Sequence, residues 1–405
     1  MIAPPQPIPA ARYRDRLTAS REALRAAGAR ALLVGPGAEL RWLVGYAAPA
    51  LERLTMLVLP LDEPPVLIVP RLERAGGAAA PAVAAGDVDL RSWEETDDPY
   101  AIVASALGTG SGAGSRAAGG SGSGSGSGVG LDRRLLVGDR LWATFVLGLQ
   151  STVPGASFGL ASSVLADLRS IKDADEIRLL TEAAEAADRT VQAIAAGRLV
   201  GRTEGDIGRE VRDRLLAEGH ETAAFSIVGS GPNSAEPHHA VSERVVGPGE
   251  PIVLDIGGTR GGYGSDTTRT LWVTGGDPGA GPDDTFRQLY AVLEAAQAAA
   301  TAAARAGVTC EAVDAAAREP ITAAGFGPAF LHRTGHGIGL EEHEEPYIVA
   351  GNAQPLAVGH AFSIEPGIYL EGRYGARIED IVVCTAEGPV SLNRSPRDVL
   401  VVSGV

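Results

Sequence analysis

Four carboxylate residues in the C-terminal half of the sequence stand beside stretches with β-strand character. They are Asp255, Asp266, Glu365 and Glu379. An ionised carboxylate beside a buried strand is unfavourable unless a cation or a metal compensates its charge. Four carboxylates in one place would repel one another and raise one another's pKa values, and one or two divalent metal ions would remove that penalty. Taken singly, each acid could equally be a turn or strand-end residue.

An internal repeat between residues 174 and 400 gives a reason to expect that the four acids converge. Helices are predicted around 174–197 and 282–306, each followed by a second helix and then by strands. The matching positions are Thr203 with Thr309, Gly219 with Gly325, and Gly249 with Gly359. Threonine favours the start of a helix and glycine its end. A pseudo-two-fold arrangement of the copies would bring all four carboxylates to one point, whereas chance similarity of Ala- and Gly-rich segments is the alternative.

All seven histidines lie between residues 220 and 360. Three of them, His332, His336 and His343, belong to the segment HRTGHGIGLEEHEEP, whose glycines allow a close approach of the backbone to a bound group. Imidazole together with carboxylates suits Zn, Mn, Co or Fe. His238 and His239 follow Pro237 in a polar loop, where a histidine could also be a polar surface residue without a function.

The composition of the chain limits the classes of protein to which it can belong. Its 405 residues favour two domains, and 45% hydrophobic with 21% charged residues is an ordinary globular balance. The 50 acidic and 35 basic residues give a formal charge of −15, which argues against a nucleic-acid binder. No run approaches the ~20 apolar residues of a membrane span. Two cysteines and a start without signal-peptide character favour the cytoplasm.

The first 165 residues are predicted to form a small α/β domain. Tyr13, Leu17 and Leu24 fall on one face of a helix that ends at Gly28. Apolar runs of strand length follow at 31–34, 54–59, 66–69 and 135–137. The Gly/Ser-rich segment 108–130 offers nothing to bury, so we expect a flexible loop inside this domain, with an interdomain linker as the alternative. Residues 166–405 form the second domain.

Five motifs in order give the chain a resemblance to a known group of enzymes. VLDIGG, YGSDTTRT, HRTGHGIGLEEHEEP, FSIEPGIY and ARIEDIVV together resemble the prolidase and aminopeptidase P group of metallopeptidases. The resemblance implies an α/β (α+β) fold, with a creatinase/prolidase-like domain at 1–165 and a pita-bread catalytic domain with internal duplication at 166–405. Methionine aminopeptidases share the pita-bread fold but lack the N-terminal domain. The Gly/Ser-rich segment is a departure from the family pattern, outside the catalytic domain.

The resemblance also implies a set of metal ligands. Matched position by position, these are Asp255, Asp266, His336, Glu365 and Glu379. Asp266 and Glu379 would bridge two divalent ions, for which Mn²⁺ is preferred and Co²⁺ or Zn²⁺ are the alternatives. Asp255 would complete the shell of one ion, and His336 and Glu365 that of the other.

Further catalytic and substrate-binding roles follow from the same resemblance. His238 would stabilise the tetrahedral intermediate, and His343 would lie near the substrate outside the metal shell. His332 would line the pocket for the residue after the cleaved bond, and Arg377 would support the metal site. Glu365 would take the proton of the attacking water and pass it to the leaving nitrogen.

The implied activity is hydrolysis of the bond between an N-terminal residue and proline in dipeptides or short peptides. The sequence does not decide between a dipeptidase of the prolidase type and an aminopeptidase P. A creatinase-like, metal-independent amidinohydrolase and a non-enzymatic binding module on the same fold are the alternatives, although such relatives have lost ligands that this chain keeps. We expect proline-containing peptides and a second copy of the chain as partners, and neither nucleic acid nor membrane.

Overall fold

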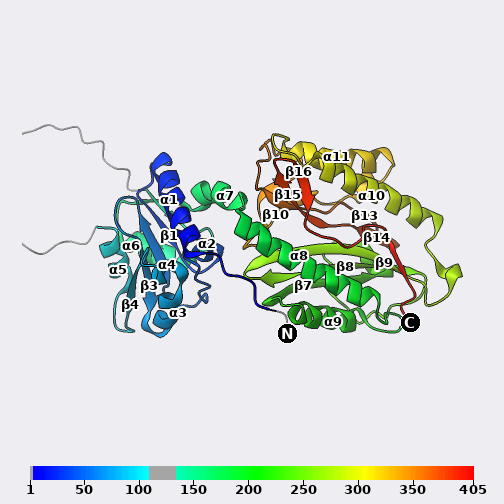
Figure 1. The fold of residues 1–405 in the computed structure, drawn as a ribbon, viewed down its shortest axis with the longest axis horizontal. Coiled ribbons are helices and arrows are strands. Elements are labelled where there is room, and N and C mark those ends of the chain that lie inside the picture. Colours follow the sequence, from blue (N-terminus) through cyan, green and yellow to red (C-terminus); the bar gives the residue numbers. More distant parts are fainter. Residues whose placement is uncertain (1–2, 109–133) are drawn as a thin grey trace, which may run out of the picture. The chain divides into compact units, whose positions relative to one another are not determined.

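The computed structural model describes residues 3–108 and 134–405, which divide into two compact units (Figure 1). The first unit is Ile8–Arg169, and the second is residues 170–405 together with residues 3–7. The boundary expected at residue 165 falls inside helix α7 (Ser162–Ser170), and the two units divide at the end of that helix. Apart from Gly108, the Gly/Ser-rich segment 108–130 lies outside the described residues.

The first unit is built on a six-stranded sheet of order β4-β3-β2-β1-β5-β6. Its strands are β1 (Ala31–Val34), β2 (Met56–Pro60), β3 (Val66–Pro70), β4 (Asp89–Trp93), β5 (Arg134–Val137) and β6 (Ser157–Leu160). Besides α7, its helices are α1 (Ala10–Ala26), α2 (Ala38–Val44), α3 (Arg74–Ala79), α4 (Pro81–Ala84), α5 (Pro99–Ala106) and α6 (Ala143–Thr152). The predicted apolar runs form the centre of this sheet, because every residue of β1, β2 and β3 is buried.

The second unit begins with two helices on a four-stranded sheet of order β17-β9-β8-β7, in which β7, β8 and β9 are antiparallel and β17 pairs in parallel with β9. These elements are α8 (Ala174–Ala195), α9 (Glu204–Ala217), β7 (Thr222–Ser230), β8 (Glu250–Arg260), β9 (Tyr263–Val273) and β17 (Leu400–Val402). Asp173 caps α8, since its carboxylate accepts hydrogen bonds from the N–H groups of Asp175 and Glu176. Aliphatic side chains of both helices pack on the sheet in one core that includes Val191, Ile207 and Leu254.

The rest of the second unit repeats this plan with shorter strands. Its helices are α10 (Asp284–Ala303) and α11 (Cys310–Ala323), and its five-stranded sheet has the order β11-β10-β12-β15-β16. The strands are β10 (Gly335–Gly337), β11 (Glu344–Ile348), β12 (Ala361–Ile364), β15 (Asp380–Thr385) and β16 (Gly388–Ser391), with a separate hairpin of β13 (Gly367–Leu370) and β14 (Tyr374–Arg377). Helices and sheet share a core that includes Leu293, Val313 and Phe362.

The duplication expected from the sequence is visible in the caps of the two second helices. Thr203 and Thr309 are the N-caps of α9 and α11, and each side chain accepts a hydrogen bond from a backbone N–H of the first turn. Each threonine also forms an isolated antiparallel bridge, Thr203 with Val245 and Thr309 with Pro355. The two copies differ in the segment that separates their two acids. In the first copy β8 and β9 are joined directly, whereas in the second copy the β13–β14 hairpin separates β12 from β15.

A buried ion pair joins the two halves at the point where their sheets meet. Arg269 on β9 is fully buried and donates to a carboxylate oxygen of Asp380 at 2.7 Å and to the carbonyl of Glu379 at 2.7 Å. The backbone N–H of Glu379 donates to the carbonyl of Thr268 at 3.1 Å. These bonds hold the start of β15 against β9. Among the helices of the described ranges, none combines the length and apolar character that crossing a membrane requires.

Candidate active site

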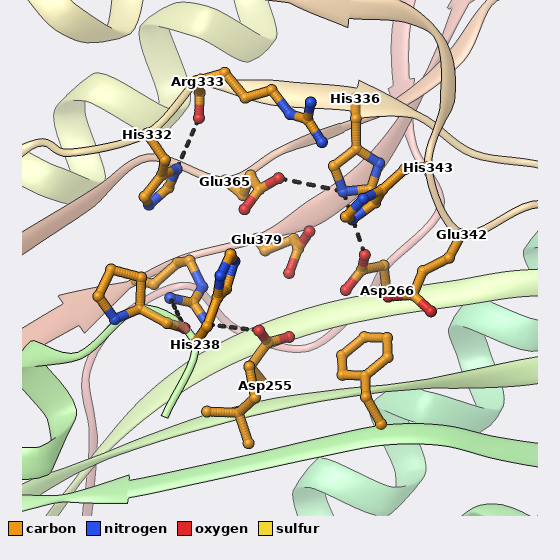
Figure 2. Close-up of a pocket in the computed structure, with 14 residues that line it drawn as sticks. His238, Asp255, Asp266, His332, Arg333, His336, Glu342, His343, Glu365 and Glu379 are labelled. Atoms are coloured by element: carbon orange, nitrogen blue, oxygen red, sulfur yellow. Dashed lines mark hydrogen bonds and ion pairs between the residues drawn. The ribbon is translucent and has the colours of Figure 1, made fainter. Parts of the chain in front are cut away.

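A cavity of about 670 Å³ lies within the second unit, between strands of its two halves (Figure 2). Its lining contains every residue that the sequence analysis assigned to the site. The lining residues are Phe225, Ile227, Pro237, His238, Asp255, Asp266, His332, Arg333, His336, Glu342, His343, Glu365, Arg377 and Glu379. The duplicated halves therefore bring all four repeat-matched carboxylates to one place, as the sequence analysis predicted.

Asp255 and Asp266 come from the β8–β9 pair. Asp255 lies opposite Thr268, and Asp266 lies opposite Gly257, two residues further along β8. Because side chains alternate across a sheet, residues two apart on neighbouring strands share one face, and both acids lie on the face that lines the cavity. Both are buried, with 7% and 4% of their surface exposed. The strand pairing thus places two carboxylates side by side with little of their surface exposed.

Glu365 and Glu379 come from the equivalent strands of the second half. Glu365 follows the last residue of β12, and Glu379 precedes the first residue of β15, next to the pair Ile364–Asp380. Hydroxyl groups orient both carboxylates, since Ser363 donates to Glu365 at 3.1 Å and Thr268 donates to Glu379 at 2.8 Å.

His336 on β10 is the histidine nearest to these acids. Its Nδ1 lies 3.1 Å from the carbonyl of Gly337, a contact that favours the proton on Nδ1. Its Nε2 then faces carboxylate oxygens of Asp266 at 3.5 Å and Glu365 at 3.3 Å. A lone pair that faces carboxylates needs a proton or a cation between them. The same tautomer, held by a backbone carbonyl, is the one found in metal-ligating histidines.

The electrostatics of the cavity also require a positive charge. Burial, together with repulsion from neighbouring carboxylates, raises the pKa values of Asp266 and Glu379 well above the ordinary range. Burial also acts to raise the pKa of Glu365, but its interactions with His336, His332 and Arg377, together with the hydrogen bond from Ser363, outweigh burial and lower that pKa. One buried oxygen of Asp255 has no hydrogen-bond partner in the described part of the chain.

The donor atoms fit one or more divalent cations. Two sets, Asp255–Asp266–Glu379 and His336–Glu365–Glu379, each have ligand atoms within 4.8 Å of one another, and they share Glu379. A third set contains Asp266, His336 and His343. Carboxylate oxygens with imidazole nitrogen suit Mn, Co, Zn or Fe. The unpartnered oxygen of Asp255 and the mutual repulsion of the buried carboxylates both favour a bound cation at this place.

Arg377 connects the acids to the far wall of the cavity. Its guanidinium donates to Asp255 at 2.5 Å and to the hydroxyl of Tyr369 at 2.7 Å. Tyr369 in turn lies 2.9 Å from Nε2 of His332, whose Nδ1 is 2.8 Å from the carbonyl of Arg333. With Nδ1 protonated, Nε2 of His332 accepts from the tyrosine hydroxyl. Burial lowers the pKa of His332, so this ring is neutral over the ordinary pH range.

The two adjacent histidines of the polar loop face different surroundings. His238 is exposed and lines the cavity, where Figure 2 shows it above Asp255. His239 is buried and has contacts with Glu204 at 2.8 Å and Glu236 at 3.2 Å. The ring of His343 lies at an angle of 56° to that of His336, with centroids 4.0 Å apart; the residue is exposed at the surface of the cavity, but partial burial of its ring and the neighbouring His336 lower its pKa to about 4. Only His238 of the loop pair can therefore contact a molecule in the cavity.

Five residues at or beside the cavity were not identified from the sequence. These are Phe225, Ile227, Arg333, Glu342 and Tyr369. The two apolar residues alternate along β7, so strand periodicity could have placed them on one face with Asp255, which is paired with Ile227. Arg333 and Glu342 stand within HRTGHGIGLEEHEEP, and only the position of its loop shows that they line the cavity.

Comparison with known proteins identifies both parts of the chain. A model of metallopeptidase family M24 matches residues 178–386, and one of the creatinase/prolidase N-terminal domain matches residues 16–171. A probable dipeptidase PepE from Mycobacterium tuberculosis is 44% identical over 393 residues, which cover 96% of each chain.

Solved structures agree with the sequence matches. The crystal structure of dipeptidase PepE from Mycobacterium ulcerans has a TM-score of 0.85 at 44% identity and covers 98% of this chain and 100% of that chain. A prolidase from Thermococcus sibiricus has a TM-score of 0.83 at 32% identity, covering 96% and 99%. The expected fold, with an N-terminal creatinase/prolidase-type domain and a pita-bread domain, is confirmed, as is the expectation of a metallopeptidase. The chain belongs to metallopeptidase family M24.

Proposed function

We propose that the chain is a dinuclear metal peptidase that hydrolyses the bond between an N-terminal residue and proline. The observation that carries this proposal is the convergence of four carboxylates and one imidazole, on two sets of ligand atoms that share Glu379. Asp255, Asp266, His336, Glu365 and Glu379 would hold the ions, of which Mn²⁺ is our first choice and Co²⁺ or Zn²⁺ the alternatives. Such ions would lower the pKa of the attacking water and polarise the scissile carbonyl.

The residues around the ligands have separate tasks in this proposal. Glu365, whose pKa is lowered against the effect of burial by its interactions with His336, His332 and Arg377, is ionised near neutral pH and can take the proton of the attacking water. It would then deliver that proton to the proline nitrogen, which as a tertiary amide nitrogen carries no hydrogen of its own. His238, exposed in the cavity, would donate a hydrogen bond to the developing oxyanion.

The part of the cavity formed by His332 and Tyr369 would receive the proline. His332 and Tyr369 are joined by a hydrogen bond, and Arg377 fixes the tyrosine hydroxyl from its other side. A neutral imidazole beside an aromatic ring offers the apolar surface that a pyrrolidine ring requires. Arg377 would act indirectly, by holding Asp255 and Tyr369, and His343 would lie near the substrate beside His336.

Dipeptides are our preferred substrate class. The relative from M. tuberculosis is named a probable dipeptidase, and the structure from T. sibiricus is a prolidase. The test is a product assay with an Xaa-Pro dipeptide and an Xaa-Pro-Xaa tripeptide in the presence of added Mn²⁺. Preferred release of proline from the dipeptide supports the proposal. Hydrolysis of the tripeptide alone indicates an aminopeptidase P, and hydrolysis of neither would reject an Xaa-Pro peptidase.

A further inference from the structure

Glu342 is a carboxylate in the cavity that the metal-ligand sets do not use. It lines the cavity but belongs to none of the three sets of ligand atoms close enough to share an ion. Its residue is exposed, and within residues 3–108 and 134–405 no hydrogen bond or ion pair joins its side chain to another residue. His336 attracts this carboxylate, but no hydrogen bond or ion pair of the described residues holds it, so it is available to a ligand in the cavity.

Glu342 occupies one particular side of the cavity. Figure 2 shows it beside Asp266, on the side opposite to His238 and His332. Its charge acts on the acids there, because repulsion from Glu342 contributes to the raised pKa of Asp266, after burial and the charges of Asp255 and Glu365. This side of the cavity therefore carries the negative charge of Glu342 in addition to the charges of the proposed metal ligands.

Two apolar side chains stand beside these acids. Phe225 pairs with Gly257, which pairs in turn with Asp266, so the three residues form one cross-strand row. The ring of Phe225 lies over Gly257, where an added Cβ would come within 2.3 Å of it. Ile227 forms the next row with Asp255. This region, defined as Phe225, Ile227 and Glu342, thus combines an apolar wall with one carboxylate.

The direction of the substrate follows from the proposed function, on which this inference rests. If His332 receives the residue after the cleaved bond and His238 faces the carbonyl oxygen, the side chain of the first residue extends to the remaining side. Glu342 lies on that side beside Asp266 (Figure 2), and the strand pairing places Phe225 in the row of Asp266 and Ile227 in the row of Asp255. The α-ammonium group lies only two bonds from the scissile carbonyl carbon, so it stays near the ligand acids, whereas a long side chain can reach the exposed Glu342.

We propose that Glu342 selects peptides whose N-terminal residue is lysine or arginine. The methylene stem of such a side chain would lie on Phe225 and Ile227, and its cationic group would pair with Glu342. An acidic first residue would be disfavoured, because it would bring a further negative charge to a region that already holds one unpaired carboxylate. Specificity then comes from a residue outside the metal ligands.

The test compares Lys-Pro, Leu-Pro and Glu-Pro as substrates of the full-length, Mn²⁺-loaded protein. In Glu342→Gln, the ratio of kcat/KM for Lys-Pro to that for Leu-Pro should fall by up to about five-fold, the range of a partly solvated ion pair. Glu342→Lys should go further and favour Glu-Pro over Lys-Pro. Glu371→Gln is the matched control, since Glu371 is exposed and does not line the cavity, and its ratio should stay unchanged.

The possible outcomes are distinct. An unchanged Lys-Pro to Leu-Pro ratio in Glu342→Gln, with Leu-Pro still cleaved, would overturn this inference alone. An equal loss on all three substrates would also overturn it, since it would show that Glu342 acts on the α-ammonium group or on the metal content. If metal-loaded wild-type protein cleaved none of the three, the proposed function and the inference would both fail.

Discussion

The ring Nε2 of His239 lies 2.8 Å from Oε2 of Glu204, a carboxylate with no exposed surface. The same carboxylate accepts hydrogen bonds from the backbone and hydroxyl groups of Ser230 and Ser242 and from the amide of Asn233. Hydrogen bonding to these groups lowers the pKa of Glu204, although burial opposes that effect. One buried residue at the start of α9 therefore anchors the loop from which His238 reaches the cavity.

This anchor predicts different defects for the two neighbouring histidines. His239→Ala should lower the free energy of unfolding by about 1–3 kcal/mol, because it removes one buried partner of Glu204. Urea denaturation of both alanine variants measures this effect, and His238→Ala should unfold as the wild type does, since His238 is exposed. Equal stability of the two variants would contradict the assigned role of His239.

The catalytic defect should fall on the other histidine. His238→Ala should keep its metal content and lose a factor of about 10²–10³ in kcat, the usual effect of removing one oxyanion donor. KM should change less, because the interaction is made mostly in the transition state. Steady-state kinetics with elemental analysis test this, and loss of metal from His238→Ala would show that His238 holds an ion instead.

Thr268 is not a proposed metal ligand, but its hydrogen bonds predict that it affects the affinity for metal. Its hydroxyl donates to Glu379 at 2.8 Å and accepts from Nε of Arg377 at 3.1 Å. Thr268→Val keeps the shape but removes both bonds, and should weaken Mn²⁺ binding by about 10–100-fold. Calorimetric titration of metal-free protein measures this, with Thr222→Val on the exposed end of β7 as the control. Equal affinity in both variants would show that Thr268 does not orient Glu379.

The raised carboxyl pKa values predict how pH affects the metal-free protein. Burial and mutual repulsion raise the pKa values of Asp266 and Glu379 in the folded state. A group with a raised folded-state pKa stabilises the fold below its unfolded pKa, about 4, and this contribution is lost as pH rises through the folded value. The metal-free protein should therefore lose stability as pH rises from about 4 to the folded-state pKa values, whereas bound cations would remove the repulsion.

Thermal melts with Mn²⁺ and with a chelator measure this difference. The increase of Tm on adding Mn²⁺ should be larger at about pH 8 than at about pH 5.5, because metal ligands must be deprotonated. An increase that shrinks as pH rises would contradict the assignment of these acids.

Local signals made much of this fold predictable. Thr203 and Thr309 are caps in the structure because capping depends on a few adjacent residues, and the apolar runs of the first unit became its central strands. Gln297 shows the limit of such signals. It is a polar residue of the helix predicted around 282–306, yet it is fully buried, with its amide 3.5 Å from a carboxylate oxygen of Asp380. A polar residue within a helix gives no sign of a partner 83 positions away.

The acids of the site could be predicted from the sequence, whereas several other residues that line the cavity could not. The acids stand at positions that match between the two copies of the repeat, and His336 stands in a glycine-rich motif of the family resemblance, so both could be found before the fold. Phe225 and Glu342 lack such a pattern, and their place depends on strand register and on the path of one loop. The homodimer and the cytoplasmic location remain predictions.

The most direct test of the central claim is the number of metal ions that the protein binds. Elemental analysis and calorimetric titration with Mn²⁺ should give two ions per wild-type chain, with loss of metal and of Xaa-Pro hydrolysis in Asp266→Asn and Glu379→Gln, since a neutral amide is a poor ligand. A wild-type chain that binds no divalent ion, or variants that keep the wild-type stoichiometry and rate, would contradict the dinuclear site.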